Sequence, residues 1–180
     1  MRVAWVVVTA GLLIAAAGAI RAATRLDRLH VRTDAAWAAL DAALCRRART
    51  VSELNGRLSG VLSSGGALRW AADAALLADG HPAPLAGEAN SVHEENPARA
   101  EVENELGRLL AVLDRRALEP AYAGWLADAE QRVVIARRVY NDAVRDTLAL
   151  RSHRMVRWLR LAGTAAAPRY FDIAEPLVSE

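Results

Sequence analysis

Side chains of the kind that bind metals gather in one polar stretch, residues 79–97, which contains GHPAPLAGEANSVHEENP. The acidic and histidine members are Asp79, His81, Glu88, His93, Glu94 and Glu95. His93 and Glu94 do not follow a recognised ligand spacing, and the sequence has no second His-x-x-x-His element. We therefore predict a solvated acidic loop at 80–97 rather than a metal site.

Nucleophilic chemistry has one candidate, Cys45, the only cysteine in the chain. His30 or His153 could serve as its base, but nothing in the sequence orients either histidine. Cys45 follows the apolar residue Leu44, which favours a small packing residue. A single cysteine also excludes an internal disulfide and a cysteine-based zinc site. Because a phosphate-binding glycine loop is missing too, we predict no catalytic residue, no metal and no cofactor, and hence no enzyme.

Four arginines recur three residues apart in LRSHRMVRWLRL, which spans 150–161: Arg151, Arg154, Arg157 and Arg160. As a helix this segment is amphipathic, with the arginines opposite Trp158 and its apolar neighbours. A voltage sensor would need further membrane-spanning segments. A net charge of +2 without a binding motif excludes nucleic acid as a predicted partner, despite a pI of 9.2.

Two interpretations of these arginines remain, and we expect both to hold. If the last helix returns to the first, its arginines meet those of the first helix in a basic collar beside anionic lipid headgroups, where each contributes about 1 kcal/mol. The predicted membrane-surface contacts are Arg21, Arg25, Arg28, Arg157, Trp158 and Arg160. In the second interpretation, aspartates spaced seven residues apart pair with arginines across the helices: Asp27 with Arg154, Asp34 with Arg151, and Asp41 with Arg145.

The composition favours helices as the elements that position these residues. Of the 180 residues, 53% are hydrophobic and only 5% aromatic, and all 23 basic side chains are arginine. Abundant alanine and leucine together with arginine and glutamate are typical of helical proteins.

An uncharged segment opens the chain at residues 3–20, VAWVVVTAGLLIAAAGAI. As a helix it spans roughly 27 Å, close to the hydrocarbon thickness of a bilayer. We predict a transmembrane anchor at 1–21. A signal peptide cleaved near Ala19 is the alternative, but helical sequence continues directly past that residue. The arginines that follow the span favour a single-pass membrane protein with its main domain in the cytoplasm.

Apolar periodicity predicts four helices in the rest of the chain. The first continues from the anchor to about Gly60, the second covers 67–79, and the third begins at Pro97. The fourth opens at Pro120 and continues to about Gly163. The first and last are each about 40 residues, or roughly 60 Å long.

The predicted fold class is therefore all-α. An N-terminal transmembrane helix leads into an extended antiparallel four-helix bundle at 22–172, with long first and last helices and two shorter middle helices. Residues 173–180 form a C-terminal tail. On the last helix, Tyr140 is predicted to lie on the seam and Asn141 to form a hydrogen bond between helices; a partner-binding spot at this pair is the alternative.

Several motifs, met in order along the chain, resemble those of the LemA family. The matching positions are Asp34 and Trp37, Arg46 and Arg47, Glu103 and Asn104, Arg137 and Arg138, Tyr140 and Asn141, and Tyr170 and Phe171. They cover roughly residues 30–172. Ser52-Glu53 replaces the Pro-Asn of the family, which identifies a divergent member. The resemblance implies a membrane-anchored, extended helical bundle and brings no catalytic residues.

We therefore predict a membrane-anchored helical scaffold or protein-interaction module of the LemA type. Its predicted partners are the lipid bilayer, through an anionic surface, and other proteins or a second copy of the chain. The alternative is an envelope-side ligand-binding or accessory domain that assists a membrane or envelope enzyme. Exposed apolar residues on the short helices would favour the scaffold, and a closed polar pocket near Tyr140 and Asn141 would favour ligand binding.

Overall fold

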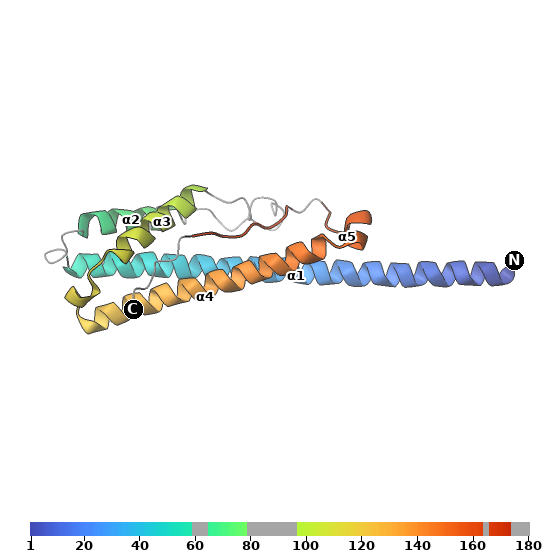
Figure 1. Cartoon of the computed structure of the whole chain (residues 1–180), viewed down its shortest axis with the longest axis horizontal. Helices are drawn as coiled ribbons and strands as arrows, with labels where there is room; N and C mark the ends of the chain where they lie inside the picture. The colour runs from blue at the N-terminus through green and yellow to red at the C-terminus, as the bar shows by residue number, and fades with distance from the viewer. Residues whose placement is uncertain (59–64, 79–96, 164–165, 174–180) are drawn as a thin grey trace.

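The computed structural model describes residues 1–58, 65–78, 97–163 and 166–173, most of which are helical, with no β-strand among them. The longest element, α1, runs without interruption over Arg2–Leu58, and its first part projects alone beyond the rest of the molecule (Figure 1). The all-α prediction is confirmed for these residues.

The projecting part of α1 is apolar and faces outward. Its large apolar side chains from Val3 to Ile14 are each at least 55% exposed. Within the described residues, α1 is the one helix that is long and apolar enough, by length and composition, to cross a membrane. The helix passes Ala19 without a break. An apolar surface of this size is unfavourable in water, so the molecule requires something that covers it.

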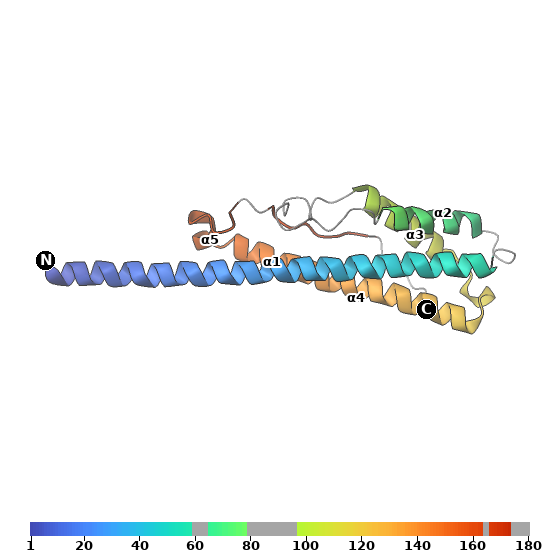
Figure 2. The same cartoon turned by 180° about the vertical axis from the view of Figure 1, so that it is seen from behind.

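The helix α4, Pro120–Arg151, lies antiparallel to the C-terminal part of α1 (Figure 2). Pro120 occupies its first turn, as predicted, because proline has no N–H to leave unpaired there. Buried hydroxyls join the two helices: the Thr33 and Thr147 hydroxyl oxygens lie 3.0 Å apart, and each hydroxyl also lies 2.9 Å from a carbonyl of its own helix to which it can donate. These hydroxyls are thereby satisfied inside an otherwise apolar seam.

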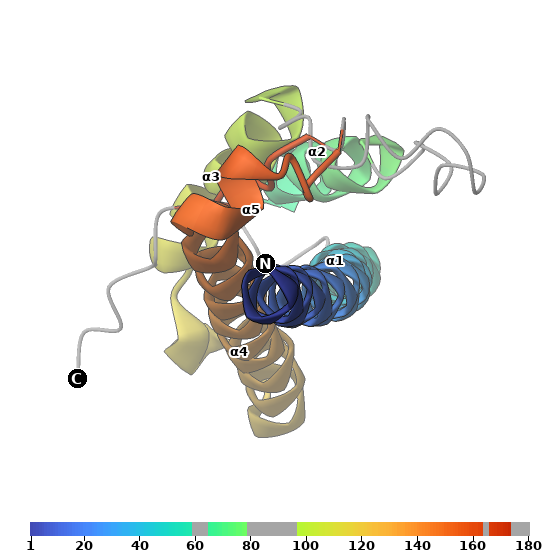
Figure 3. The same cartoon turned by 90° about the vertical axis from the view of Figure 1, so that its right-hand side faces the viewer.

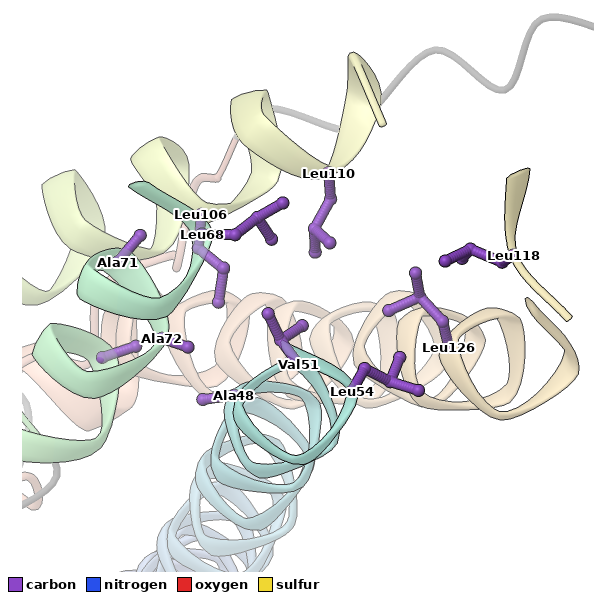
Figure 4. Packing of buried hydrophobic residues seen from close by; sticks show 11 residues of the cluster. Ala48, Val51, Leu54, Leu68, Ala71, Ala72, Leu106, Leu110, Leu118 and Leu126 are labelled. Carbon is purple, nitrogen blue, oxygen red and sulfur yellow. The ribbon is translucent and has the colours of Figure 1, made fainter. Parts of the chain in front are cut away.

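Two shorter helices, α2 (Gly65–Leu77) and α3 (Pro97–Ala111), form a second layer over the far end of the α1–α4 pair (Figures 1 and 3). The second helix therefore begins and ends two residues earlier than the predicted 67–79. Leucines of α3 and α4 pack against α1 and α2 in this layer (Figure 4). The α2 residues that face α1 are mostly alanine, which lets the two backbones approach closely.

A short 3-10 turn, η1 (Arg115–Ala117), connects α3 to α4. The Asp114 carboxylate caps it by accepting from the Arg116 N–H at 3.0 Å. The Arg115 guanidinium donates to both carboxylate oxygens of Glu130, at 2.7 and 2.9 Å. This hydrogen bonding raises the pKa of Arg115 and fixes the turn to α4.

The last long helix ends earlier than predicted. It stops at Arg151, and Ser152 and His153 separate it from the short helix α5, Arg154–Trp158. The prediction of one helix to Gly163 is therefore wrong. The Ser152 hydroxyl donates to the Ala149 carbonyl at 2.7 Å, and such bonds compete with the continuation of a helix. The break also allows Val156 to be buried.

After α5 the chain reverses direction through Arg160 and Gly163, whose φ angles of 50° and 56° are left-handed. Residues 166–173 then run back over the α1–α4 pair, in the layer that α2 and α3 occupy farther along (Figure 1). Ile173 is buried in the core, and the rest of the predicted tail, 174–180, lies outside the described residues.

Candidate functional site

An aromatic cluster joins α1, α4 and the C-terminal segment. The ring of Trp37 lies 5.2 Å from that of Tyr140 and 5.6 Å from that of Phe171, measured between centroids. Tyr140 and Phe171 are buried, and the tilted and edge-on geometries are those that aromatic pairs prefer. We call Trp37, Tyr140, Asn141 and Phe171 the clasp. All four are positions of the family resemblance, so the structure brings these predicted residues together.

The clasp holds the C-terminal segment by its backbone. The Asn141 side chain donates to the Phe171 carbonyl at 3.2 Å and accepts from the Phe171 N–H at 3.0 Å. The Tyr140 hydroxyl donates to the Arg169 carbonyl at 2.8 Å. An extended segment beside two helices has no sheet partner, and these side chains satisfy its polar groups instead. The predicted helix-to-helix bond of Asn141 is thus corrected, because the C-terminal segment accepts it.

Two arginines of α4 contact the same segment near its two ends. Arg137 donates to the Ile173 carbonyl at 2.8 Å, and Arg151 donates to the Ala166 carbonyl at 3.1 Å. Arg151 therefore differs from the other three arginines of its predicted stripe, since it helps to fix the segment to the helix pair.

A second polar cluster lies between α1 and α3 and is almost entirely buried. Arg47 and Glu103 form an ion pair at 2.5 Å, with side chains only 4% and 1% exposed. Beside it, Arg99 pairs with Asp41 at 2.6 Å. Each buried charge thus has an opposite charge in contact, without which burial would be strongly unfavourable. Arg47 and Glu103 are positions of the resemblance, whereas no pattern in the sequence pointed to Arg99.

Cys45 lies in the same interior and is buried. Its sulfur accepts from Arg99 at 3.9 Å. His30 precedes it by fifteen residues on α1, which places it roughly 22 Å away along the helix axis. The packing role predicted for Cys45 agrees with this position.

The remaining positions of the resemblance contribute less to the interior. Asn104 is half-buried, and the others are exposed: Asp34, Arg46, Arg138 and Tyr170.

The predicted membrane-surface residues lie where α5 packs on α1. The Met155 thioether lies against Gly18, and Val156 and Leu26 are buried. All six of the predicted residues are exposed: Arg21, Arg25, Arg28, Arg157, Trp158 and Arg160. We call these six residues the basic collar. The expected return of the chain to the first helix therefore occurs, although through a separate short helix.

The predicted aspartate–arginine register is wrong in part. Asp41 pairs with Arg99, and Arg145 pairs with Asp142 on its own helix at 3.0 Å. From α1 to α4, Arg32 pairs with Asp146 at 3.0 Å. The apolar seam alone does not fix the offset between the two helices along their axes. The buried Thr33–Thr147 contact and the clasp hold the offset that the structure shows.

A groove of about 380 Å³ opens between α1 and α4 beside the basic collar. From α1 it is lined by Arg25, Leu29 and Arg32, and from the other side by Asp146, Ala149, Leu150 and His153. Apolar side chains thus lie between cationic ones. The sequence predicted Arg25 at a lipid surface but not a groove, because the offset of the two helices decides which residues meet.

No group of three or more metal-binding side chains occurs within the described ranges. The acidic loop predicted at 80–97 falls almost wholly outside those ranges, as do its histidines.

No protein family, curated protein or solved structure matches the chain in the three comparisons made.

Proposed function

We propose that this protein is a membrane-anchored helical scaffold or protein-interaction module of the LemA type, without catalytic activity. In this proposal the anchor at 1–21 spans the bilayer once, the basic collar meets an anionic lipid surface, and the long helices hold the layer of α2 and α3 away from the membrane. The main domain is an extended four-helix bundle on the cytoplasmic side.

The observation that carries the proposal is the outer face of α2. Trp70 and Leu77 are 69% and 82% exposed, and their spacing of seven residues places them on one face of the helix. The opposite face of α2 packs into the core. A helix with apolar residues on both faces, at the end remote from the anchor, has a surface suited to a protein partner.

The dimensions of α1 support a spacer role. Trp70 lies on the helix that packs along the last turns of α1, near Ser52, which hydrogen-bonds to Asp73. The path from Arg21 to Ser52 covers about thirty residues of α1, or roughly 46 Å of helix. A partner bound to α2 would therefore be held at a fixed height above the lipid.

The ligand-binding alternative has less support. It calls for a closed polar pocket at the level of Tyr140 and Asn141, and the polar groups of both residues bond to the C-terminal segment there.

Photo-crosslinking in cells tests the interaction proposal. A photoreactive phenylalanine would replace Trp70 or Leu77, with Ala127, exposed on α4, as the matched control. We expect adducts from both α2 positions and none from Ala127, and an adduct of twice the chain mass would identify a second copy. Equal adducts at all three positions, or none from α2, would contradict the proposal.

Orientation and anchoring need a separate measurement. In a Cys45→Ser background, Gln131→Cys places one thiol on an exposed position of α4. We expect protection from a membrane-impermeant maleimide in intact cells, labelling after lysis, and retention in the membrane after alkaline carbonate extraction. Labelling of intact cells would place the bundle on the envelope side, and release by carbonate would contradict the anchor.

A further inference from the structure

We infer that the groove between α1 and α4 binds the phosphate headgroup of an anionic glycerophospholipid. This inference rests on the proposed membrane anchor, and it adds a specific ligand site to what would otherwise be a general attraction between arginines and the bilayer.

The charge around the groove is strongly positive. The two segments that form this end of the packed region, 21–32 and 146–160, contain eight arginines and two aspartates. One of the aspartates, Asp146, is paired with Arg32. Among the described residues, the Arg25 guanidinium has no acidic partner. A phosphate diester would supply the missing negative charge and the acceptor oxygens that a guanidinium binds in pairs.

The lining of the groove suits the two chemical parts of a lipid headgroup. Arg25, Arg32 and His153 supply hydrogen-bond donors, while Leu29, Ala149 and Leu150 supply apolar surface between them. Arg32 donates to Asp146 through one nitrogen, Nη1, so its other N–H groups are available to a ligand. The volume of about 380 Å³ is in the range of small-ligand sites.

The position along α1 also fits a headgroup. Arg25 follows the last residue of the apolar segment, Ile20, by five residues, or about 7 Å along the axis. The headgroup layer on each side of a bilayer is about 5–7 Å thick. Arg25 therefore lies at the outer edge of the headgroup layer. Leu29 and Arg32 lie about 6 and 10 Å farther along the axis, so a headgroup held in the groove extends outward from the bilayer surface.

The short helix α5 supports the same level for the membrane surface. Trp158 is 87% exposed, and Met155 and Leu159 are also exposed, next to an α1 segment that ends the apolar span. Tryptophan and arginine together are typical of a membrane–water interface. The groove lies directly beyond this interfacial helix, because His153 lines the groove and precedes α5.

Native mass spectrometry of the full chain in detergent tests the inference. Phosphatidylglycerol and phosphatidylcholine would be added in turn at equal concentration, and the fraction of protein that retains one lipid would be measured. We expect retention of phosphatidylglycerol over phosphatidylcholine. Arg25→Gln should lower that retention about fivefold, the equivalent of one arginine at an anionic lipid.

Two further variants make the result specific to the groove. Arg28→Gln removes the same charge from the collar on α1, one turn away and outside the groove, and it should lower lipid retention less than Arg25→Gln does. Ala149→Trp fills the groove without changing its charge and should abolish the preference for phosphatidylglycerol. Both replaced residues are exposed, so circular dichroism should show native helix content in each variant.

Distinct outcomes would overturn the inference. Equal retention of the two lipids by the native chain, or equal losses in Arg25→Gln and Arg28→Gln, would leave only a diffuse basic surface. Displacement of the lipid by an equal concentration of inorganic phosphate would indicate a site for free anions. Carbonate extraction reports the anchor independently of lipid charge, so failure of the headgroup site and failure of the proposed function give different results.

Discussion

The clasp and the basic collar use polar side chains in opposite ways. At the clasp, the polar atoms of Tyr140 and Asn141 bond to backbone groups of the chain itself. At the collar, Arg25, Arg157 and Arg160 are exposed and form no ion pair with any residue that the structure describes. Both regions contain residues that the sequence marks as unusual, but only the collar has capacity left for a partner.

The comparison teaches that a family-like motif and a binding surface need not coincide. The clasp and the Arg47–Glu103 pair account for most of the buried positions of the resemblance, and these residues hold the chain together. The outward features, Trp70 on α2 and the groove at Arg25, lie elsewhere. Substitutions at the first set should therefore change stability, and substitutions at the second should change binding.

The largest expected loss of stability comes from breaking the buried ion pair of Arg47 and Glu103. Glu103→Gln leaves the Arg47 guanidinium buried opposite a neutral group, which should lower the free energy of unfolding by about 3–5 kcal/mol. Urea titration of the full chain in detergent, followed by helical circular dichroism, measures this loss. Glu101→Gln, exposed on the same helix, is the control. A loss below about 1 kcal/mol would mean that Arg47 finds other compensation.

The next largest effect is a difference in stability between substitutions at two adjacent aromatic residues, Phe171 and Tyr170. Phe171→Ala removes the ring that packs on Trp37 and should cost about 3 kcal/mol, or release the C-terminal segment altogether. Tyr170→Ala, at an exposed position, should change stability little. Limited proteolysis and amide hydrogen exchange at residues 169–173 measure the release. Equal protection in the two variants would show that the aromatic cluster does not hold the segment.

A smaller effect isolates the hydrogen bonds of the clasp. Asn141→Ala leaves the backbone N–H and carbonyl of Phe171 without their partner, which should cost about 1–2 kcal/mol. Hydrogen exchange of the Phe171 amide should accelerate accordingly. Exchange of the Thr147 amide, on the same helix as Asn141, should not change. Unchanged exchange at Phe171 would indicate that the ring packing alone fixes this backbone.

At the collar, the same kind of measurement should show almost nothing. Arg157→Gln combined with Arg160→Gln removes two exposed charges that have no acidic partner in the described part of the chain. We expect the free energy of unfolding to change by less than about 0.5 kcal/mol. A loss comparable to that of Asn141→Ala would place these arginines among the structural residues and remove the contrast between the two regions.

The smallest effect concerns pH and an exposed pair on α4. A hydrogen bond from Arg132 lowers the pKa of Asp128 below its usual value. A carboxylate with a lowered pKa in the folded state stabilises the protein above its unfolded pKa, and this contribution disappears as pH falls through the folded value. Asp128→Asn should therefore match the native chain at low pH and fall only slightly below it at neutral pH. A large difference at neutral pH would contradict the exposed position of the pair.

Sequence patterns predicted the elements well because those depend on local properties. The uncharged run at 3–20, the proline at 120 and the helical periodicity each act through neighbours in the chain. The sequence did not predict that α4 ends at Arg151, because its helical periodicity continues past this residue. The hydrogen bond of the Ser152 hydroxyl and the burial of Val156 outweigh that periodicity.

For the contacts between elements, the sequence predicted which types of residue would meet but not which particular residues would pair. The sequence indicated that arginines would meet near the anchor, but not that Arg32 would pair with Asp146, because an antiparallel seam allows several offsets of similar energy. The clasp depends on a segment that has no periodic signal of its own, so its partners follow only from the folded positions of Trp37 and Tyr140.

By itself, then, the sequence determined the all-helical class, the long apolar first helix and the location of the basic residues, since propensity, hydropathy and charge are written in each local stretch. Only the tertiary structure decided that Arg47 meets Glu103, that Asn141 holds Phe171 and that Arg25 borders a groove. Arg47 and Glu103 are 56 positions apart in the sequence, and Arg25 and His153, which line the same groove, are 128 apart. Such contacts are set by how the packed layers align, which no local pattern encodes.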